Sequence, residues 1–392
     1  MELQEKKITF MLALNCRYGG NLIPSLMYLA KFLTCKYKAN ITWVLPRQEK
    51  AAWIVEAESK YKVYYTTAPY NKSADELYDI LNEIKPDIVH THFELYDISV
   101  AKAISRIDKE IKQVWHVHDI MSFSTKGEDK RLLRYLKRKI IYPLRYHWYG
   151  RKAYYIAVSH QMAAFVGHFR KHFLTEPPHY SNEALLNLKF PNVTTIINGM
   201  VESRLQKSKD VERKDNVFTF LTFGGNFRGK GIDIVLNACK KLEKAGTPFR
   251  ILITKGNSLE ESIHNFLNTE KLPSWVKIVP QIDDIASLFG QSDCYISASR
   301  GETMSFAIAE ATYFMLPVIQ SDIPGTYWNA KNPSTYMFKN EDAEDLYMAM
   351  MKVMQEDKTQ ITEKCAETLK CNKALLNIDV WKEKIINIYR VI

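Results

Sequence analysis

The stretch "SRGETMSFAIAEATYFMLPVIQSD", residues 299–322, carries two glutamates in a segment of mostly small and apolar side chains. Glu302 and Glu310 have seven residues between them, and "AIAEATYF" around Glu310 is too apolar for the exposed face of a helix. A buried carboxylate without a partner is costly, so proteins pair it or shift its pKa. The two glutamates therefore require partners.

This stretch and the six residues before it, 293–298, predict a strand, a loop and a helix. Residues 293–299 form the strand, and the helix begins near Ser305 and continues to Phe314. Glu302 then lies in the loop and Glu310 two turns into the helix. Eight positions are slightly more than two helical turns, so both carboxylates can face the carboxyl end of the strand. Open α/β sheets bind ligands at this end, where a carboxylate can accept hydrogen bonds from vicinal hydroxyls.

This strand–helix pattern recurs along the chain. Short β-branched or apolar runs alternate with amphipathic segments, which is typical of βαβ units and a parallel sheet. The predicted strands are 7–14, 40–45, 87–92, 113–118, 154–159, 193–199, 218–224, 250–256, 276–282, 293–299 and 317–322. The helical segments between them include 22–37, 74–84 and 97–110. The polar stretch 202–216 separates the two series and is interpreted as a linker.

The expected fold class is therefore α/β with two Rossmann-like domains, residues 1–203 and 204–375. Residues 376–392 contain an amphipathic helix that we expect to return to the first domain. The longest apolar run near the start, 8–14, is broken by Thr9, so we expect neither a signal peptide nor a transmembrane helix. The six cysteines form no CxxC pair, which indicates reduced thiols in a cytoplasmic protein.

The net charge of +10 lies entirely in the first 200 residues and is concentrated in residues 126–152. In this segment Leu133, Leu136, Ile140 and Leu144 follow helical spacing, with lysines, arginines and aromatic residues beside them. Such a helix suits an anionic membrane surface, which is the interpretation we favour. A core helix with a solvated basic face remains an alternative. Binding of nucleic acid or another acidic partner is the least favoured, and we expect no nucleic acid.

Two glycine-containing junctions follow the first strand of each series. "NCRYGGNL", 15–22, is either a phosphate-binding turn or simply a tight strand-to-helix turn. "FGGNFRGKGID", 223–233, adds Arg228 and Lys230 at a helix start, which favours a diphosphate over a merely solvated basic turn. It lacks the GK[ST] arrangement of a Walker A loop.

Histidines follow strand alternation in two places. His116 and His118 point the same way at the end of one predicted strand, and His90 and His92 repeat the pattern one strand earlier. His118, which precedes Asp119, is the better placed to meet a ligand. Because the two pairs lie on separate strands without a set of carboxylates, we expect no metal site.

Taken in order, several motifs resemble one family. They are "YGG", "KPDIVHTH" (85–92), "HVHD" (116–119), "AVSH" (157–160), "IINGM" (196–200), "GGNFRGKGID" and the Glu–seven residues–Glu motif with its trailing "LPVI". Over essentially the whole chain, this order resembles the retaining GT-B glycosyltransferases of the large bacterial polysaccharide and lipid-glycan family, glycosyl transferases group 1 and family 4. The resemblance implies two domains facing across a cleft and metal-independent transfer of a sugar from a nucleotide-diphosphate sugar, expected to be UDP-linked. It also implies a glycan or lipid-linked acceptor, a place at the inner face of the cell membrane, and no cofactor.

The resemblance also assigns roles to single residues. Glu302, His118 and Lys230 would carry the reaction, with Glu302 on the donor sugar's hydroxyls, Lys230 on the diphosphate and His118 near the reacting carbon. The donor-binding residues that it implies are Gly19, Gly20, Gly225, Arg228, Lys230, Thr303, Met304, Ser305 and Glu310.

Two departures from the family pattern stand out. Gly225 occupies the position of the family's usual arginine, and Thr303–Ser305 replaces its usual Gly-Phe-Gly. We expect the second change to govern donor preference. The first supports an alternative function, a non-catalytic GT-B subunit that binds acceptor or stabilises a partner transferase. A sugar-nucleotide epimerase fits less well, because the basic segment would then have no task.

Overall fold

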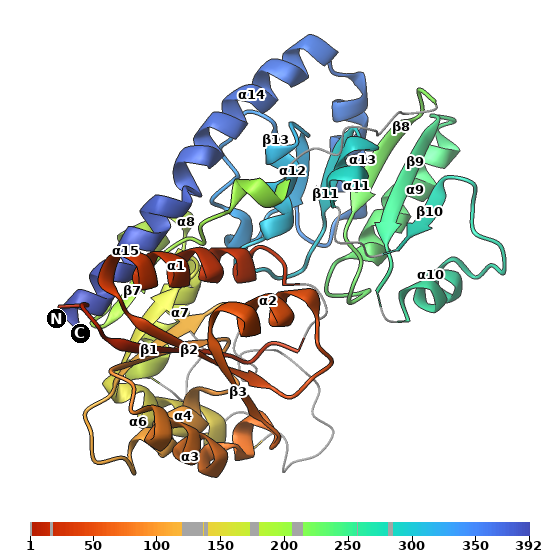
Figure 1. Ribbon diagram of the computed structural model, residues 1–392. Helices are drawn as coiled ribbons and strands as arrows, with labels where there is room; N and C mark the ends of the chain where they lie inside the picture. The colour runs from red at the N-terminus through yellow and green to blue at the C-terminus, as the bar shows by residue number, and fades with distance from the viewer. Residues whose placement is uncertain are drawn as a thin grey trace. The chain divides into compact units, whose positions relative to one another are not determined.

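The computed structural model describes residues 2–15, 19–119, 136, 140–172, 180–205, 215–256, 258–280 and 285–392. The chain divides into two α/β units, Met1–Val201 with Ile378–Ile392, and Glu202–Asn377 (Figure 1). The sequence places these divisions after residues 203 and 375. Each unit contains one parallel sheet, as predicted for a Rossmann-like domain.

The first unit has a sheet of seven parallel strands in the order β3-β2-β1-β4-β5-β6-β7. Its strands are β1 (Lys7–Leu12), β2 (Asn40–Pro46), β3 (Lys62–Thr66), β4 (Ile88–His92), β5 (Lys112–Val117), β6 (Ala153–Ala157) and β7 (Val193–Thr195). Its described helices are α1 (Leu22–Tyr37), α2 (Ala52–Lys60), α3 (Ala74–Ile84), α4 (Asp97–Ile104), α6 (Tyr142–Tyr149), α7 (His160–Lys171), α8 (Asn182–Asn187) and α15 (Ile378–Val391).

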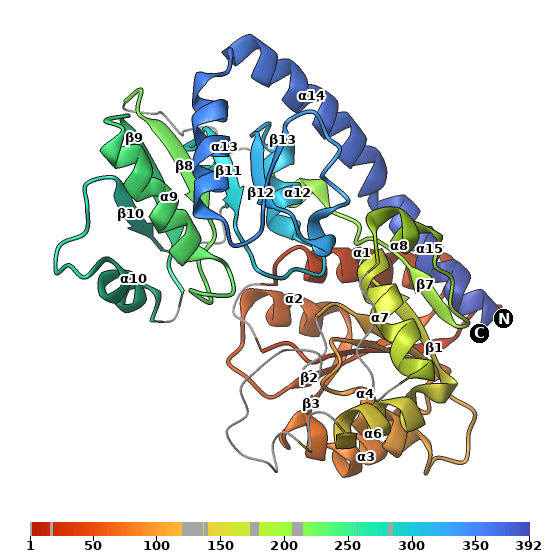
Figure 2. The ribbon, with the colours of Figure 1, turned by 180° about the vertical axis from the view of Figure 1, so that it is seen from behind.

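Helices cover both faces of this sheet (Figures 1 and 2). Side chains of α1, α2 and α15 share one apolar core with one face of the central strands, and α3 and α4 form a second core on the other face. Trp381 and Tyr389 of α15 are buried in the first of these cores. The predicted return of the C-terminal helix to the first unit is therefore confirmed.

The second unit has six parallel strands in the order β10-β9-β8-β11-β12-β13. They are β8 (Phe218–Thr222), β9 (Phe249–Thr254), β10 (Val276–Val279), β11 (Cys294–Ser297), β12 (Val318–Ser321) and β13 (Thr335–Phe338). The helices are α9 (Ile232–Lys244), α10 (Leu259–Leu267), α11 (Ile285–Gly290), α12 (Phe306–Tyr313), α13 (Ala343–Gln355) and α14 (Lys358–Leu375). Helices α9 and α13 pack side by side over one face of the sheet (Figure 2).

Several local predictions can be compared with these bounds. Helices α1 and α3 have the predicted limits, whereas the helix predicted over 97–110 ends at Ile104, where two tight turns follow. The sequence pattern missed β3 and β13, the edge strands whose residues are partly exposed. Residues 126–135 and 137–139 of the predicted basic segment and the middle of the predicted linker lie outside the described residues. No helix in the described part of the chain is both long and apolar enough to cross a bilayer.

Asp97, the first residue of α4, is a buried acid in the first unit. Its carboxyl group accepts hydrogen bonds from Thr91 Oγ1 at 2.6 Å and from Tyr146 Oη at 3.0 Å. Burial raises the pKa of Asp97 to about 8, although these hydrogen bonds act in the opposite direction. The folded chain therefore keeps this carboxyl group neutral at pH values where the unfolded chain ionises it.

This difference predicts a pH-dependent effect of Asp97→Asn. An unfolded aspartate has a pKa of about 3.9, so the wild type loses the stability contributed by this group as the pH rises from about 4 to 8. The asparagine variant does not titrate. Its stability relative to the wild type should therefore rise by roughly 3–4 kcal/mol between pH 5 and pH 8, measured by urea unfolding. Asp79→Asn, at an exposed position on α3, is the matched control and should show no such trend. If the difference in free energy of unfolding between the wild type and Asp97→Asn is the same at every pH, this account is contradicted.

Candidate functional site

The candidate site lies where the strand order of the second sheet reverses. From β8 the chain proceeds outward to β9 and β10, and it then returns to β11 on the opposite side of β8. The carboxyl ends of β8 and β11 are therefore neighbours at a topological switch point, where open α/β sheets bind ligands. The loop 223–231 follows β8, and the loop 298–305 follows β11. Two motifs separated by some seventy residues thus meet at one edge of the sheet.

Glycines allow these two loops to pack against each other. Gly231, which precedes α9, has a φ of +66°, and a Cβ there would lie 1.9 Å from the backbone oxygen of Ala298 after β11. Gly225 has a φ of +141°, and Gly224 donates its backbone N–H to Thr254 Oγ1 at 2.9 Å. Side chains at positions 225 and 231 would strain the backbone or collide with the neighbouring loop. The glycines are therefore needed for the loop's path.

Arg300 holds the β8 loop in place. Its guanidinium donates two hydrogen bonds of 2.8 Å to the carboxylate oxygens of Asp233, in the first turn of α9. Its backbone N–H donates to Gly229 O at 3.0 Å, and its side chain also reaches the backbone oxygen of Arg228. Burial would raise the pKa of Asp233, but the hydrogen bonds from Arg300 outweigh it and leave that pKa lowered. The sequence interpretation missed this pair. The only available signal was an arginine next to the Glu302 motif and an acid at the start of a helix.

Glu302 and Lys230 form an ion pair between the two loops. Lys230 Nζ lies 2.6 Å from Glu302 Oε1, and Ser299 Oγ donates to the same oxygen at 2.8 Å. The Glu302 side chain is 14% exposed, whereas that of Lys230 is 41% exposed. The carboxylate is thus fixed by two partners while the ammonium group remains accessible to solvent. This contact brings together the two residues that the sequence predicts for sugar and diphosphate.

Glu310 lies on α12 with its side chain buried. The charges of both glutamates act on the hydroxyl group of Tyr295, on β11. Burial raises the pKa of the Tyr295 hydroxyl well above its ordinary value, and the charges of Glu302 and Glu310 raise it further. Both carboxylates therefore lie near enough to Tyr295 for their charges to act on its hydroxyl.

The start of the segment between the two glutamates packs against Gly325, which follows β12. Thr303 is partly exposed, while Met304 and Ser305 are buried, and Ser305 is the N-cap residue of α12. Gly325, after β12, touches the backbone here: a Cβ on it would lie 1.8 Å from Glu302 O. The sequence interpretation did not single out Gly325, because its contact depends on β12 lying beside β11.

The remaining predicted residues belong to the first unit. Gly19 and Gly20 follow β1, and Gly20 has a φ of +53°. His118 follows β5 and is buried, with Nε2 3.0 Å from His92 Nδ1. Burial lowers the pKa of His118 to about 3, so its imidazole is neutral. In this sheet β1 lies next to β4, which is again a switch point.

The four histidines gather in one cluster. Strands β4 and β5 are neighbours, and His92 is in register with His116. The sequence places the two histidine pairs on separate strands and predicts no metal site, but in the folded sheet the ring centroids of His92 and His116 are only 5.0 Å apart. Within the described part of the chain, His90, His92 and His116 are the group whose ligand atoms lie close enough to hold a metal ion.

Two family models match the chain, one in each unit. The model described as Glycosyltransferase Family 4 matches residues 45–172, and the model described as Glycosyl transferases group 1 matches residues 218–356. The second match contains both loops of the candidate site. Together the two matches span more than half of the chain, in the order that the sequence resemblance implies.

Individual relatives and solved structures agree with this assignment. The O-antigen biosynthesis glycosyltransferase WclY of Escherichia coli is 31% identical over 118 residues, which are 27% of this chain and 31% of that protein. The chain thus spans about a third of the length of the curated relatives that it matches.

Solved structures also match nearly the whole chain, among them HepE and WaaG. HepE of Anabaena, solved in complex with UDP and glucose, superposes with a TM-score of 0.74 at 16% identity, over 99% of this chain and 100% of that one. WaaG, a glycosyltransferase involved in lipopolysaccharide biosynthesis, superposes with a TM-score of 0.69 at 13% identity, over 97% of this chain and 99% of that one. The chain therefore belongs to the group 1 and family 4 glycosyltransferases, and its two parallel-sheet units have the GT-B fold.

Proposed function

We propose that the protein is a retaining glycosyltransferase that moves a sugar from a nucleotide-diphosphate sugar, expected to be UDP-linked, to a glycan or lipid-linked acceptor. The product would belong to a cell-surface polysaccharide or glycoconjugate. The observation that carries this proposal is the Lys230–Glu302 pair, held at the switch point of the second sheet with Glu310 nearby. Support also comes from the relative WclY, named for O-antigen biosynthesis, and from HepE, solved with UDP and glucose.

The donor's diphosphate would bind beside the β8 loop. Lys230 Nζ would leave Glu302 and contact a diphosphate oxygen, and the exposed Arg228 lies in the same loop to add a second positive charge. The N-termini of α9 and α12 begin at these loops, so their dipoles also favour an anion. These groups would stabilise the charge that develops on the leaving nucleotide diphosphate, which is electrostatic catalysis. We propose that protein cations and dipoles carry this charge without a metal ion.

The two glutamates would divide the donor between them. Glu302, released from Lys230, would accept hydrogen bonds from the sugar's hydroxyls, and Glu310 would accept those of the ribose. Backbone N–H groups of residues 303–305 would lie beside the sugar and the phosphate. The acceptor hydroxyl would attack the face from which the diphosphate leaves, so the anomeric configuration is retained. No carboxylate is then required as a covalent nucleophile.

In the first unit, His118, Gly19 and Gly20 are the residues that we propose contact the donor. A neutral imidazole can donate a hydrogen bond to a sugar hydroxyl without adding a positive charge, and burial keeps His118 neutral. The paired glycines would let the backbone approach the phosphate closely.

The first unit also offers a surface suited to a membrane. Around α6, the side chains of Ile140, Ile141, Leu144 and Trp148 are exposed, with Trp148 at 61%. Arg151 lies over the Trp148 ring, 4.9 Å from its centroid. These exposed apolar side chains belong to the basic sequence segment 126–152, which favours peripheral binding to anionic lipids at the inner face of the cell membrane.

A second candidate function rests on Gly225. Without the family's usual arginine at this position, the protein could bind an acceptor or stabilise a partner transferase and catalyse no transfer itself. Incubation with a panel of UDP-sugars, followed by mass analysis, separates the two functions. Release of UDP from one donor supports the enzyme. If the protein neither binds nor hydrolyses any nucleotide sugar at millimolar concentration, this result would support the non-catalytic subunit.

Glu302→Gln and Lys230→Met should each reduce transfer at least about 100-fold, because each removes a group that acts on the donor or the leaving diphosphate. The melting temperature should change little, since partly exposed ion pairs contribute only about 0–1 kcal/mol. Lys241→Met is the matched control, because Lys241 is 42% exposed and pairs with Glu344 away from the site. If either site variant unfolds, or keeps wild-type transfer, the proposed roles fail.

Gly325→Ala should weaken donor binding through the backbone of Glu302. The added Cβ would overlap Glu302 O, so the loop between β11 and α12 must shift. We expect KM for the donor to rise at least about tenfold, because small displacements of positioning groups have large effects. Gly246→Ala is the control: Gly246 has a φ of +69° and open space around it, so this variant should lose stability but keep the donor KM. Equal KM values in both variants would show that Gly325 does not position the loop.

Replacement of Lys137, Arg138 and Lys139 by glutamine should weaken sedimentation with anionic liposomes. The remaining binding should depend less on salt, because fewer charges contribute. The variant Lys31→Gln/Lys277→Gln/Lys370→Gln removes the same charge from exposed positions elsewhere and should bind as the wild type does. Equal liposome binding by wild type and the first variant would contradict the membrane interpretation.

A further inference from the structure

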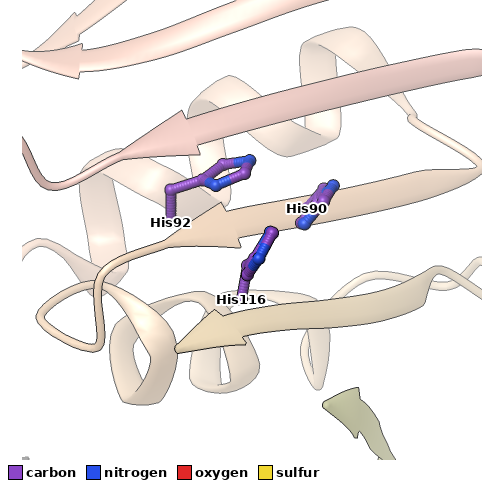
Figure 3. Close-up of side chains that lie close together, drawn as sticks. All are labelled: His90, His92 and His116. Carbon is purple, nitrogen blue, oxygen red and sulfur yellow. The ribbon is translucent and has the colours of Figure 1, made fainter. Parts of the chain in front are cut away.

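The buried histidine cluster of the first unit has no task in the proposed transfer beyond His118. Figure 3 shows the rings of His90 and His92, from β4, and of His116, from the adjacent β5, gathered in one space. One ring nitrogen of each lies within 4.8 Å of the corresponding nitrogens of the other two. All three side chains are at most 1% exposed.

Several nitrogens in this cluster lack a partner. Among the described residues, His90 Nε2, His92 Nε2 and both ring nitrogens of His116 make no hydrogen bond. Leaving a buried polar atom unsatisfied costs roughly 1–3 kcal/mol, so several in one place require an explanation. A ligand that accepts electron pairs from three nitrogens would satisfy them together.

The hydrogen bonds that the cluster does make suit such a ligand. His90 Nδ1 lies 2.6 Å from Tyr389 Oη, and His92 Nδ1 lies 3.0 Å from His118 Nε2. If Nδ1 of His90 and of His92 carries the ring proton and donates a hydrogen bond to these partners, Nε2 of each ring presents a lone pair. Metal-bound histidines have this arrangement, with one nitrogen on the metal and the other donating to an outer partner.

We propose that His90, His92 and His116 form a binding site for a divalent first-row transition metal ion of the zinc type. Three imidazoles without a thiolate suit zinc, and magnesium and calcium prefer oxygen ligands. Zinc–nitrogen bonds of about 2.0–2.1 Å place tetrahedral ligands about 3.4 Å apart, so the rings would turn toward the ion on binding.

This site would be structural. Its ligands lie on two adjacent strands, and Tyr389 connects His90 to α15. A bound ion would therefore cross-link the centre of the sheet and hold the C-terminal helix against it. The inference does not depend on the proposed transfer, in which the metal takes no step.

Metal binding by the full-length, tag-free protein tests the proposal. After treatment with a chelator, the protein is titrated with Co²⁺ and its visible absorption recorded, and its melting temperature is measured with and without Zn²⁺. We expect one equivalent of Co²⁺ with the intense bands of four- or five-coordinate cobalt, displacement by Zn²⁺, and a melting temperature several degrees higher with Zn²⁺. An apoprotein that binds no Co²⁺ and is not stabilised by Zn²⁺ would overturn the proposal.

Variants separate this cluster from a surface site. His168 and His172 lie one turn apart on or next to α7, with ring centroids 5.3 Å apart, and could bind metal adventitiously. The double variant His168→Gln/His172→Gln should keep the cobalt spectrum and the stoichiometry of the wild type. If this variant loses the cobalt bands and binds no Co²⁺, the proposal is overturned. His116→Gln should abolish the bands.

Tyr389→Phe provides a test that does not remove a ligand. It should lower Co²⁺ affinity about 10–100-fold without changing the stoichiometry, because it removes the outer partner of His90. Unchanged affinity in this variant, or an unaltered spectrum in a folded His116→Gln variant, would contradict the site.

Discussion

The ion pair between Lys230 and Glu302 is the contact on which the second unit's site depends. It joins the loop after β8 to the loop after β11, and Ser299 Oγ donates a hydrogen bond to the same carboxylate oxygen. In the unliganded protein each charged group neutralises the other. In the proposed function, a nucleotide sugar would offer each of them a new partner, a diphosphate for the ammonium group and hydroxyls for the carboxylate. Donor binding would thus replace one internal pair by two contacts to the ligand, with both groups already in position.

The contacts around this pair explain why the two loops keep their shape without a ligand. Arg300 connects the β11 loop to Asp233 at the start of α9, and glycines at 231 and 325 allow the backbones to approach closely. Neither glycine could accept a side chain without moving Ala298 or Glu302. Preorganisation of this kind is what electrostatic catalysis requires, because charged groups that must rearrange during the reaction lose much of their effect. In each unit, predicted donor-contacting residues follow strands at the point where the strand order reverses, which is where open α/β sheets bind ligands.

The sequence predicted the parts of this structure that depend on local pattern. Eleven expected strands correspond to observed ones, and the loop position of Glu302 and the helical position of Glu310 are confirmed. The edge strands β3 and β13 were missed because their partly exposed residues do not produce the apolar runs of central strands. Gly325, the Arg300–Asp233 pair and the histidine cluster were also missed as contacts. Each depends on which strands are neighbours and in what register, and this follows from the folded sheet and not from local spacing. The roles of the site residues remain predictions.

A crystal structure of the protein with a nucleotide-diphosphate sugar would test the central claim most directly. The account predicts that Lys230 Nζ contacts the diphosphate, that Glu302 accepts hydrogen bonds from the sugar's hydroxyls, and that Glu310 accepts those of the ribose. The Lys230–Glu302 distance should then exceed the 2.6 Å of the unliganded pair. An intact pair, with the ligand bound away from the loops after β8 and β11, would contradict it.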